Sequence, residues 1–270
     1  MQTITARTFD IGYMDTLAGG DSALHRLDAR AKLLVTLLFI VSVVSFNRYE
    51  ISRLMPFFLY PVFLIAAGEL PAGYLLHKVL AVAPFAIFVG VFNPLLDRTV
   101  LFHVGPLAVS GGMASFLSII IRFLLTVTGA LCLVALTGVN GICAALESFG
   151  VPKVFAVQLL FLNRYITVLA GEAERMARAR ALRSFSSKEM PAAVFARLAG
   201  QLLLRAYSRA ERIYNAMLCR GFDGRLPLPR QAVFCGKDAV FVAAWAVLFA
   251  IFRLVDIPQF FGIFLTGLFK

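Results

Sequence analysis

Long uncharged stretches dominate the first half of the chain. Uncharged runs cover Leu33–Asn47, Leu54–Gly68 and Val79–Leu96, and a fourth apolar stretch, Phe116–Leu136, contains one charge at Arg122. A helix needs about 20 mainly apolar residues to cross the hydrocarbon core of a bilayer. Tilt, or flanking basic side chains that reach the interface, can compensate for the two shorter runs. The pattern therefore predicts four membrane-spanning helices between residues 33 and 137.

Three residues inside these runs predict local departures from a straight apolar helix. Pro56 and Pro61 indicate that the second span starts late or is kinked, because proline lacks the N–H that a helix interior uses. A charge at mid-bilayer is costly. We therefore expect Arg122 to face the helix bundle or to lie toward a water-exposed end of its span.

After Thr137 the pattern becomes amphipathic. The sequence predicts one long helix over Pro152–Ser184, apolar in its first half and charged in its second, and another over Met190–Arg220. The apolar residues of the second recur at three- and four-residue steps, which is typical of a helix with one apolar face. They are Val194, Phe195, Leu198, Leu202, Leu203, Ala206, Tyr207, Ala210, Ile213, Tyr214 and Met217. By the same period, Arg197, Arg205, Arg209 and Arg212 fall off that stripe, as expected of charges that face solvent or lipid headgroups. Two apolar stretches, Ala239–Val255 and Ile257–Phe269, then return to the membrane.

An arginine ends the apolar stripe of each long helix. Arg220 lies seven residues after Ile213 and precedes Gly221, a suitable C-cap, while Arg180 lies four residues after Met176. The residues beside the two arginines are small: Ala179, Ala181, Cys219 and Gly221. A desolvated guanidinium pairs well with a carboxylate or with carbonyls, so the arrangement predicts a knob for a groove on another protein. The alternative of two ordinary helix-end cations, favoured by the helix dipole, stays open on periodicity alone.

Composition and charge placement support a membrane protein with a basic cytoplasmic side. Hydrophobic residues make up 60% of the chain and charged residues 15%, whereas a soluble domain carries about 25% charge. The net charge is +11, and 15 of the 26 Lys and Arg lie between residues 138 and 237. Cytoplasmic loops are enriched in Lys and Arg. This places residues 1–32 and 138–237 in the cytoplasm, as four preceding spans also require.

The sequence contains no recognisable catalytic or metal-binding constellation. The four cysteines lack ligand-like spacing, and His25, His77 and His103 stand singly on different predicted segments. No GxxxxGK[ST] phosphate loop is present, so ATP hydrolysis would have to come from partners. A self-contained carrier or channel is the main alternative, but such proteins place ionisable residues along a path in the membrane, where only Arg122 is found.

Three further segments, taken in order, point to a family. They are DSALHRLDARAKLL at Asp21–Leu34, the long stretch Ala145–Ser184, and AMLCRGFDG at Ala216–Gly224. Together they resemble the T components of energy-coupling-factor (ECF) transporters, especially the CbiQ-like cobalt and nickel branch. The family signature is a pair of Ala-Arg-Gly-like motifs at the ends of two coupling helices. Here Ala179–Arg180–Ala181 and Cys219–Arg220–Gly221 match it in their arginines, with small departures in the flanking positions.

The resemblance implies a non-enzymatic subunit of a larger importer in a bacterial or archaeal plasma membrane. Its expected partners are two ABC-type ATPase subunits, which receive the motif arginines in grooves, and a CbiM-like substrate-binding membrane S subunit that carries cobalt or nickel. A small accessory membrane protein is a further optional component. No cofactor, resident metal or nucleic-acid partner is implied.

The expected fold class is an all-α integral membrane protein with about five transmembrane helices and two long amphipathic coupling helices. We expect a cytoplasmic N-terminal segment over 1–32 and a four-span region over 33–137. Coupling helices over 138–237 and a C-terminal transmembrane region over 238–270 complete the predicted organisation.

Overall fold

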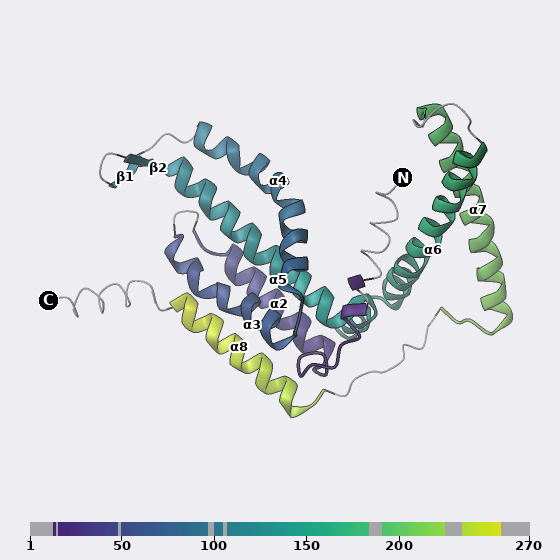
Figure 1. The fold of residues 1–270 in the computed structure, drawn as a ribbon. Coiled ribbons are helices and arrows are strands. Elements are labelled where there is room, and N and C mark those ends of the chain that lie inside the picture. The colour runs from purple at the N-terminus through teal and green to yellow at the C-terminus, as the bar shows by residue number, and fades with distance from the viewer. Residues whose placement is uncertain are drawn as a thin grey trace. The chain divides into compact units, whose positions relative to one another are not determined.

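The computed structural model describes residues 13–14, 16–47, 50–96, 100–104, 107–183, 191–224 and 234–254 (Figure 1). The described residues form an all-α membrane protein with one short β-hairpin. The chain divides into two compact units. One comprises residues 17–138 and 232–270, here called the membrane unit; the other comprises residues 1–16 and 139–231, here called the coupling unit.

The membrane unit is built from the predicted apolar segments. Its elements are α2 (Ala29–Val44), the 3-10 helix η1 (Ser52–Phe58), α3 (Leu59–Ala67), α4 (Ala72–Leu96), the first part of α5 (Gly111–Ser148) and α8 (Gly236–Leu254). Pro56 lies inside η1, which confirms that the second apolar segment departs from a straight α-helix at its start. The C-terminal stretch predicted over Ile257–Phe269 lies outside the described residues.

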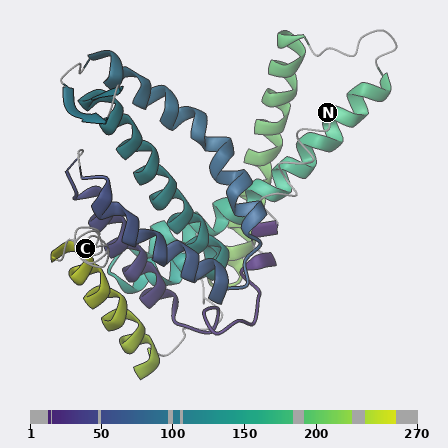
Figure 2. The ribbon, with the colours of Figure 1, turned by 60° about the vertical axis from the view of Figure 1, so that its left-hand side comes forward.

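α4 and α5 run side by side and are joined by an antiparallel hairpin (Figures 1 and 2). The hairpin pairs β1 (Val100–Val104) with β2 (Leu107–Ser110), and hydropathy did not indicate it. The amide of Asn93 on α4 donates a hydrogen bond of 3.0 Å to the hydroxyl of Ser115 on α5. α4 begins at Ala72, seven residues before the uncharged run that starts at Val79, and therefore includes His77 and Lys78.

Within the part of the chain that the structure describes, three helices are long and apolar enough to cross a membrane: α4 over Ala72–Pro94, α5, and α6 (Lys153–Arg183). α2 and the continuous η1–α3 segment are shorter and would need tilt or a locally thinner bilayer. The sequence predicts α6 as a cytoplasmic helix. The high mean hydropathy of α6 comes from the first half of the helix, whereas the second half carries most of its charged residues.

The core of the membrane unit is aromatic. Phe39 of α2 packs against Tyr60 of α3 with ring centroids 4.6 Å apart, and against Phe249 of α8 at 5.7 Å. Trp245 of α8 meets Tyr60 edge-on at 4.9 Å. The buried hydroxyl of Tyr60 is satisfied by Thr36, whose Oγ1 lies 2.7 Å from Tyr60 Oη. These contacts hold α2, α3 and α8 together, because aromatic pairs at such distances stabilise beyond their buried area.

Two arginines satisfy carbonyl groups at the end of α2. Arg122, on α5, donates a hydrogen bond of 2.7 Å to the carbonyl of Asn47, and Arg253, on α8, donates one of 3.3 Å to the carbonyl of Ser45. Ser45 is the C-cap of α2, and carbonyls at a helix end lack helical partners, so the Arg253 contact stabilises this end; Asn47 lies in the turn that follows. Arg122 therefore reaches the end of a neighbouring helix of the bundle, in line with the prediction from its cost at mid-bilayer.

The coupling unit consists mainly of two long helices, α6 and α7 (Ala192–Cys219), which follow the last turns of α5. α5 ends in a left-handed Gly150, where the N–H of Val151 donates to the carbonyl of Leu146 over 3.2 Å. This is the Schellman arrangement that commonly ends a helix.

Candidate functional site

The candidate site is the helix pair α6 and α7, whose ends carry the two arginine motifs. α6 starts directly after Pro152 and α7 directly after Pro191, where a missing N–H costs nothing. Their bounds lie within two residues of those predicted by hydrophobic periodicity. Val154 near the start of α6 and Met217 near the end of α7 line one groove, so the helices run in broadly opposite directions.

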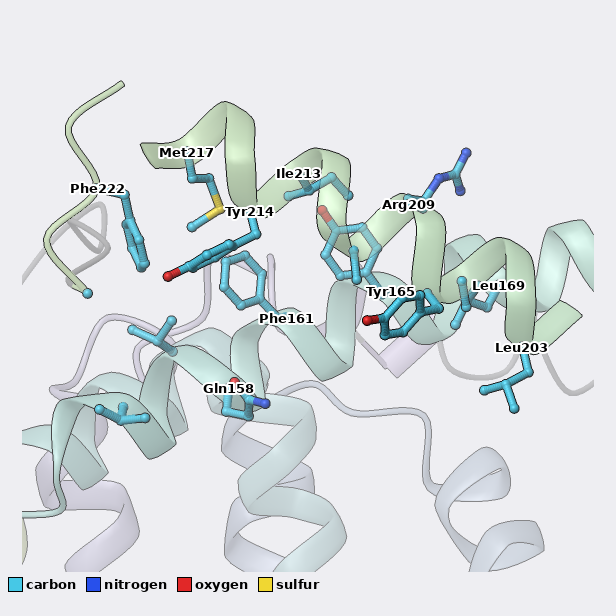
Figure 3. Close-up of a pocket in the computed structure, with 16 residues that line it drawn as sticks. Gln158, Phe161, Tyr165, Leu169, Leu203, Arg209, Ile213, Tyr214, Met217 and Phe222 are labelled. Atoms are coloured by element: carbon cyan, nitrogen blue, oxygen red, sulfur yellow. The ribbon is translucent and has the colours of Figure 1, made fainter. Parts of the chain in front are cut away.

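An apolar groove of about 650 Å³ lies between α6 and α7 (Figure 3). Its walls are mostly aromatic or aliphatic. They include Phe161, Tyr165 and Leu169 from α6, and Ile213, Tyr214 and Met217 from α7. The groove thus forms where the apolar stripes of the two helices meet, which is the face that amphipathic helices bury first.

The apolar stripe of α7 divides into a half-buried part and an exposed part. The half-buried residues are Val194, Leu198, Leu202, Ala206, Ile213 and Met217. The exposed ones are Phe195, Leu203, Tyr207, Ala210 and Tyr214, and Leu203 retains 71% of its accessible surface. A stripe this wide exceeds what one neighbouring helix can cover. Part of it therefore remains available for lipid or for another protein.

Burial within α6 and α7 is slight. Ala156 is the only buried residue of the two helices. Large apolar side chains, such as those of Val154, Phe155 and Leu182, are more than 60% exposed. Burial of apolar surface is the main favourable contribution to folding. The pair therefore requires an apolar neighbour beyond the contacts it makes within its own unit.

Glu172 of α6 ties the two helices together. Its Oε1 lies 3.3 Å from Arg205 Nη1 and its Oε2 lies 3.6 Å from Arg209 Nη1, both on α7. The Glu172 side chain is only 16% exposed. Arg209, which periodicity places off the apolar stripe, keeps 39% of its side chain exposed and also lines the groove, where it lies beside Glu172.

The first motif lies near the C-terminal end of α6. Arg180 is half-buried, on the same face as the half-buried Leu169, Ala173 and Met176, while Ala179 and Ala181 are exposed. Arg180 lines a hollow of about 580 Å³ together with Glu172 on its own helix and Leu198 on α7. Within the described residues its guanidinium makes no hydrogen bond or ion pair.

The second motif forms the end of α7. The N–H of Phe222 donates to the carbonyl of Met217 over 3.0 Å, and that of Gly221 to the carbonyl of Leu218 over 2.9 Å. Gly221 has a φ of +78°, as a Schellman C-cap requires. The exposed Arg220 is thereby held on a rigid turn. In the described part of the chain, its side chain also has no hydrogen-bonding or ionic partner.

The two motifs lie far apart along the helix pair. Arg180 follows Glu172 by eight residues, or about 12 Å of helix, and Arg220 follows Arg209 by eleven residues, or about 17 Å. Because the helices run in opposite directions from the Glu172–Arg209 contact, the motif arginines are separated by about 30 Å. One globular partner could hardly receive both in a single groove, whereas two neighbouring subunits could.

Sequence reasoning identified the arginines but missed Glu172. Glu172 is one of few acidic residues in a basic region, and it lies one position before Ala173 of the α6 stripe, which was the available signal. Groups of three or more His, Cys, Asp or Glu that could hold a metal do not occur among the described residues.

Comparisons with known proteins cover most of the chain. Residues 20–231 match the family described as cobalt transport protein, CbiQ. Three similar proteins are each named energy-coupling factor transporter transmembrane protein EcfT. That of Heliobacterium modesticaldum is 31% identical over 252 residues, covering 86% of this chain and 92% of the relative. Those of Bacillus subtilis and Ruminiclostridium cellulolyticum are 27% identical over 251 residues and 26% over 252; they cover 86% and 85% of this chain and 93% of each relative.

Proposed function

The chain belongs to the CbiQ family of cobalt transport proteins, and we propose that it is the transmembrane coupling (T) subunit of an ECF-type importer. In this role it is a multi-pass subunit of a bacterial cell membrane and not itself an enzyme. It transmits the ATP-driven motion of two ABC-type ATPase subunits to a separate substrate-binding membrane S subunit.

One observation carries the coupling role. Two arginines without a described intramolecular partner lie about 30 Å apart, at the ends of a helix pair whose apolar faces are largely uncovered. Arg180 and Arg220, with their neighbours Ala179, Ala181, Cys219 and Gly221, are the proposed ATPase-contacting motifs. Two grooves on two ATPase subunits would receive one arginine each. A shift of those subunits would then move both ends of the pair.

The proposed substrate is cobalt or nickel, carried by a CbiM-like S subunit. The family is described by cobalt transport, whereas the names of the three relatives mention no ion. The substrate subunit would choose between the two ions. The proposed organisation keeps residues 1–32 and 138–237 in the cytoplasm, with transmembrane regions over 33–137 and 238–270.

The test removes both motif arginines in the assembled complex. Arg180→Ala with Arg220→Ala should weaken co-purification of the ATPase subunits and abolish ATP-driven uptake of radioactive cobalt into vesicles. Truncation of an arginine at the centre of an interface often lowers the binding free energy by about 2 kcal/mol or more, which corresponds to a loss of about thirtyfold in affinity.

Arg197→Ala is the matched control, since Arg197 is exposed on α7 and forms no ion pair among the described residues. Arg205 and Arg209 are unsuitable controls because both contact Glu172. Unchanged ATPase co-purification and uptake in the double variant would overturn the proposal.

A further inference from the structure

Gly138 breaks helix α5 at the point where the chain leaves the membrane unit. Its φ of 67° and ψ of 163° are far from helical values and lie in a region that is essentially restricted to glycine. A Cβ at this position would lie 3.0 Å from the Cβ of Ala18. The boundary between the two compact units falls directly after this residue. The break also interrupts the helical hydrogen bonds that span it, so carbonyls just before it need other donors.

Lys32 supplies such a donor. Its Nζ lies 3.0 Å from the carbonyl oxygen of Leu136, two residues before the break, and 3.4 Å from that of His25. Lys32 is 5% exposed and directly precedes the first uncharged stretch of the chain. Among the described residues, Nζ is therefore held by two carbonyl oxygens and forms no ion pair.

A buried acceptor for the same ammonium is left unused. Asp28 is 4% exposed; its Oδ1 accepts a hydrogen bond of 2.9 Å from the N–H of Arg30, while its Oδ2 is buried without a hydrogen-bonding partner. Both oxygens of Asp238 are satisfied, by the N–H groups of Asp28 and Cys235. A buried carboxylate oxygen with no partner is costly. Asp28 caps α2 and Lys32 follows it by four residues, so the two side chains lie on one face of the helix.

We propose that Gly138 is the pivot of the coupling unit and that Lys32 is its latch, alternating between the Leu136 carbonyl and the Asp28 carboxylate. In the present structure α5 is broken and Nζ holds Leu136. When Gly138 adopts helical angles, the Leu136 carbonyl accepts from the N–H of residue 140, as in any α-helix. Nζ then transfers to Asp28 Oδ2. In each state Lys32 donates to one buried acceptor, and a change at Gly138 exchanges one of these hydrogen bonds for the other.

The latch rests on the proposed coupling function, because a pivot between the two units matters when the coupling helices transmit motion. It assigns Lys32 as a positioning residue that acts through the helix break. Nothing is transferred covalently; one hydrogen bond is exchanged for another.

The test measures the position of α7 relative to the membrane unit in the complete transporter in nanodiscs. Spin labels at Gly73→Cys and Gly200→Cys suit this purpose, because a Cβ at either glycine meets no atom within 4 Å. The background carries Cys219→Ala, which gives the second motif the Ala-Arg-Gly form of the family signature, and Cys235→Ser; together they remove the exposed native thiols. We expect two distance populations whose ratio changes when ATP binds.

The two latch variants should shift that ratio in opposite directions. Lys32→Met leaves the Leu136 carbonyl without its donor, which favours the continuous helix. Asp28→Asn keeps the Oδ1 bond to Arg30 but removes the alternative anion, which favours the broken helix. A hydrogen bond to a charged group is worth enough for a shift of about tenfold in each case. Lys237→Met is the control, since Lys237 is exposed beside the same cluster.

Unchanged ratios, or shifts in the same direction, would overturn the latch. Asp28→Asn decides alone if Lys32→Met does not fold. A complex that binds and hydrolyses ATP normally but shows no opposite shifts contradicts the latch and leaves the coupling function intact. Failure of the unmodified chain to bind ATPase subunits contradicts the proposed function itself.

Discussion

Glu172 on α6 accepts a hydrogen bond of 3.3 Å from Arg205 on α7, and this contact joins the two helices that carry the arginine motifs. Arg209 adds a second ion pair to the same carboxylate at 3.6 Å. Both arginines are substantially exposed, so solvent screens the pairs and each contributes about 0.5 kcal/mol. The link is nevertheless the polar contact that fixes how α6 and α7 cross.

We predict that Glu172→Gln loosens the helix pair. Loss of both ion pairs should reduce disulfide formation between Ala173→Cys and Leu202→Cys about threefold to fivefold, since these positions line one hollow between the helices. The cross-linking yield is measured in membranes. Glu211→Gln is the control, because Glu211 is exposed on α7 and makes no described ion pair. Equal yields in the two variants would contradict the role of Glu172.

The turn that presents Arg220 depends on Gly221. Gly221→Ala places a side chain at a φ of +78°, which costs about 1 kcal/mol, so the last turn of α7 should fray. Amide hydrogens of Leu218–Phe222 should exchange about fivefold faster, as measured by mass spectrometry. Gly200→Ala is a matched control within the same helix. It meets no atom within 4 Å and should stabilise α7, because alanine favours helices over glycine. Faster exchange in both variants would refute the C-cap explanation.

The sequence was sufficient to predict features that repeat along the chain. Hydrophobic periodicity placed α6 and α7 within two residues of their observed bounds, because a helical stripe of apolar residues is a local signal. Gly221 could be identified as a C-cap for the same reason. The aromatic core between α2, α3 and α8 is consistent with the apolar runs, but no local pattern specifies that Phe39 meets Phe249.

Features that depend on contacts between distant residues could not be predicted. The break at Gly138 is supported by Lys32, about a hundred residues earlier in the chain, and resembles an ordinary glycine in the sequence. Glu172 and Arg209 meet only because α6 and α7 cross at that position. The hairpin between α4 and α5 likewise follows from chain pairing rather than from hydropathy.

The Lys and Arg distribution predicts that α7 faces the cytoplasm. A cysteine at Ser208, which is exposed, should react with a membrane-impermeant reagent only after the cells are permeabilised, in a background without exposed native thiols. Positions 188 and 225, in the same predicted cytoplasmic block, lie outside the described residues and are further labelling sites. Labelling of intact cells at any of these positions would overturn the topology.

His25 predicts a pH dependence of stability below neutrality. The ring of His25 is half-buried. Its Nδ1 lies 2.7 Å from Ser22 Oγ, and its Nε2 donates a hydrogen bond of 3.0 Å to the carbonyl of Leu17. Burial lowers the pKa of His25 from its ordinary value of 6.5. Between that value and the lower folded pKa, the unfolded chain binds more protons than the folded protein. Stability should therefore fall as the pH falls through this window and should not change through His25 above it.

The measurement compares thermal unfolding at about pH 7.5 and about pH 5.5 for the wild type and His25→Gln. The hydrogen bond to the Leu17 carbonyl opposes the effect of burial on this pKa, as do Asp21 and Glu69, whereas Lys32 lowers the pKa further. The loss of stability on acidification should be smaller in His25→Gln than in the wild type. An equal loss in both proteins would assign the acid sensitivity to other groups.

Conservative replacement of the motif arginines separates coupling from simple attachment. Lysine keeps the charge of Arg180 and Arg220 but lacks the planar guanidinium that fixes the geometry of several hydrogen bonds at once. If the arginines only attach the ATPase subunits, Arg180→Lys and Arg220→Lys should lower assembly and transport in proportion. If they transmit motion, the variants should still assemble but should transport poorly for each ATP hydrolysed.

We expect the second result, because each arginine lies at the end of a helix that makes few buried contacts of its own. When the groove on an ATPase subunit moves, it would displace the helix end that carries the bound arginine. The exposed apolar faces of α6 and α7 could then slide against their neighbours. The quantity to measure is metal uptake per ATP hydrolysed in reconstituted vesicles, beside a pull-down of the same variants, with Arg197→Lys as the control. A ratio equal to that of the wild type, with uptake and hydrolysis falling only as far as assembly falls, would leave attachment as the sole role of the two arginines.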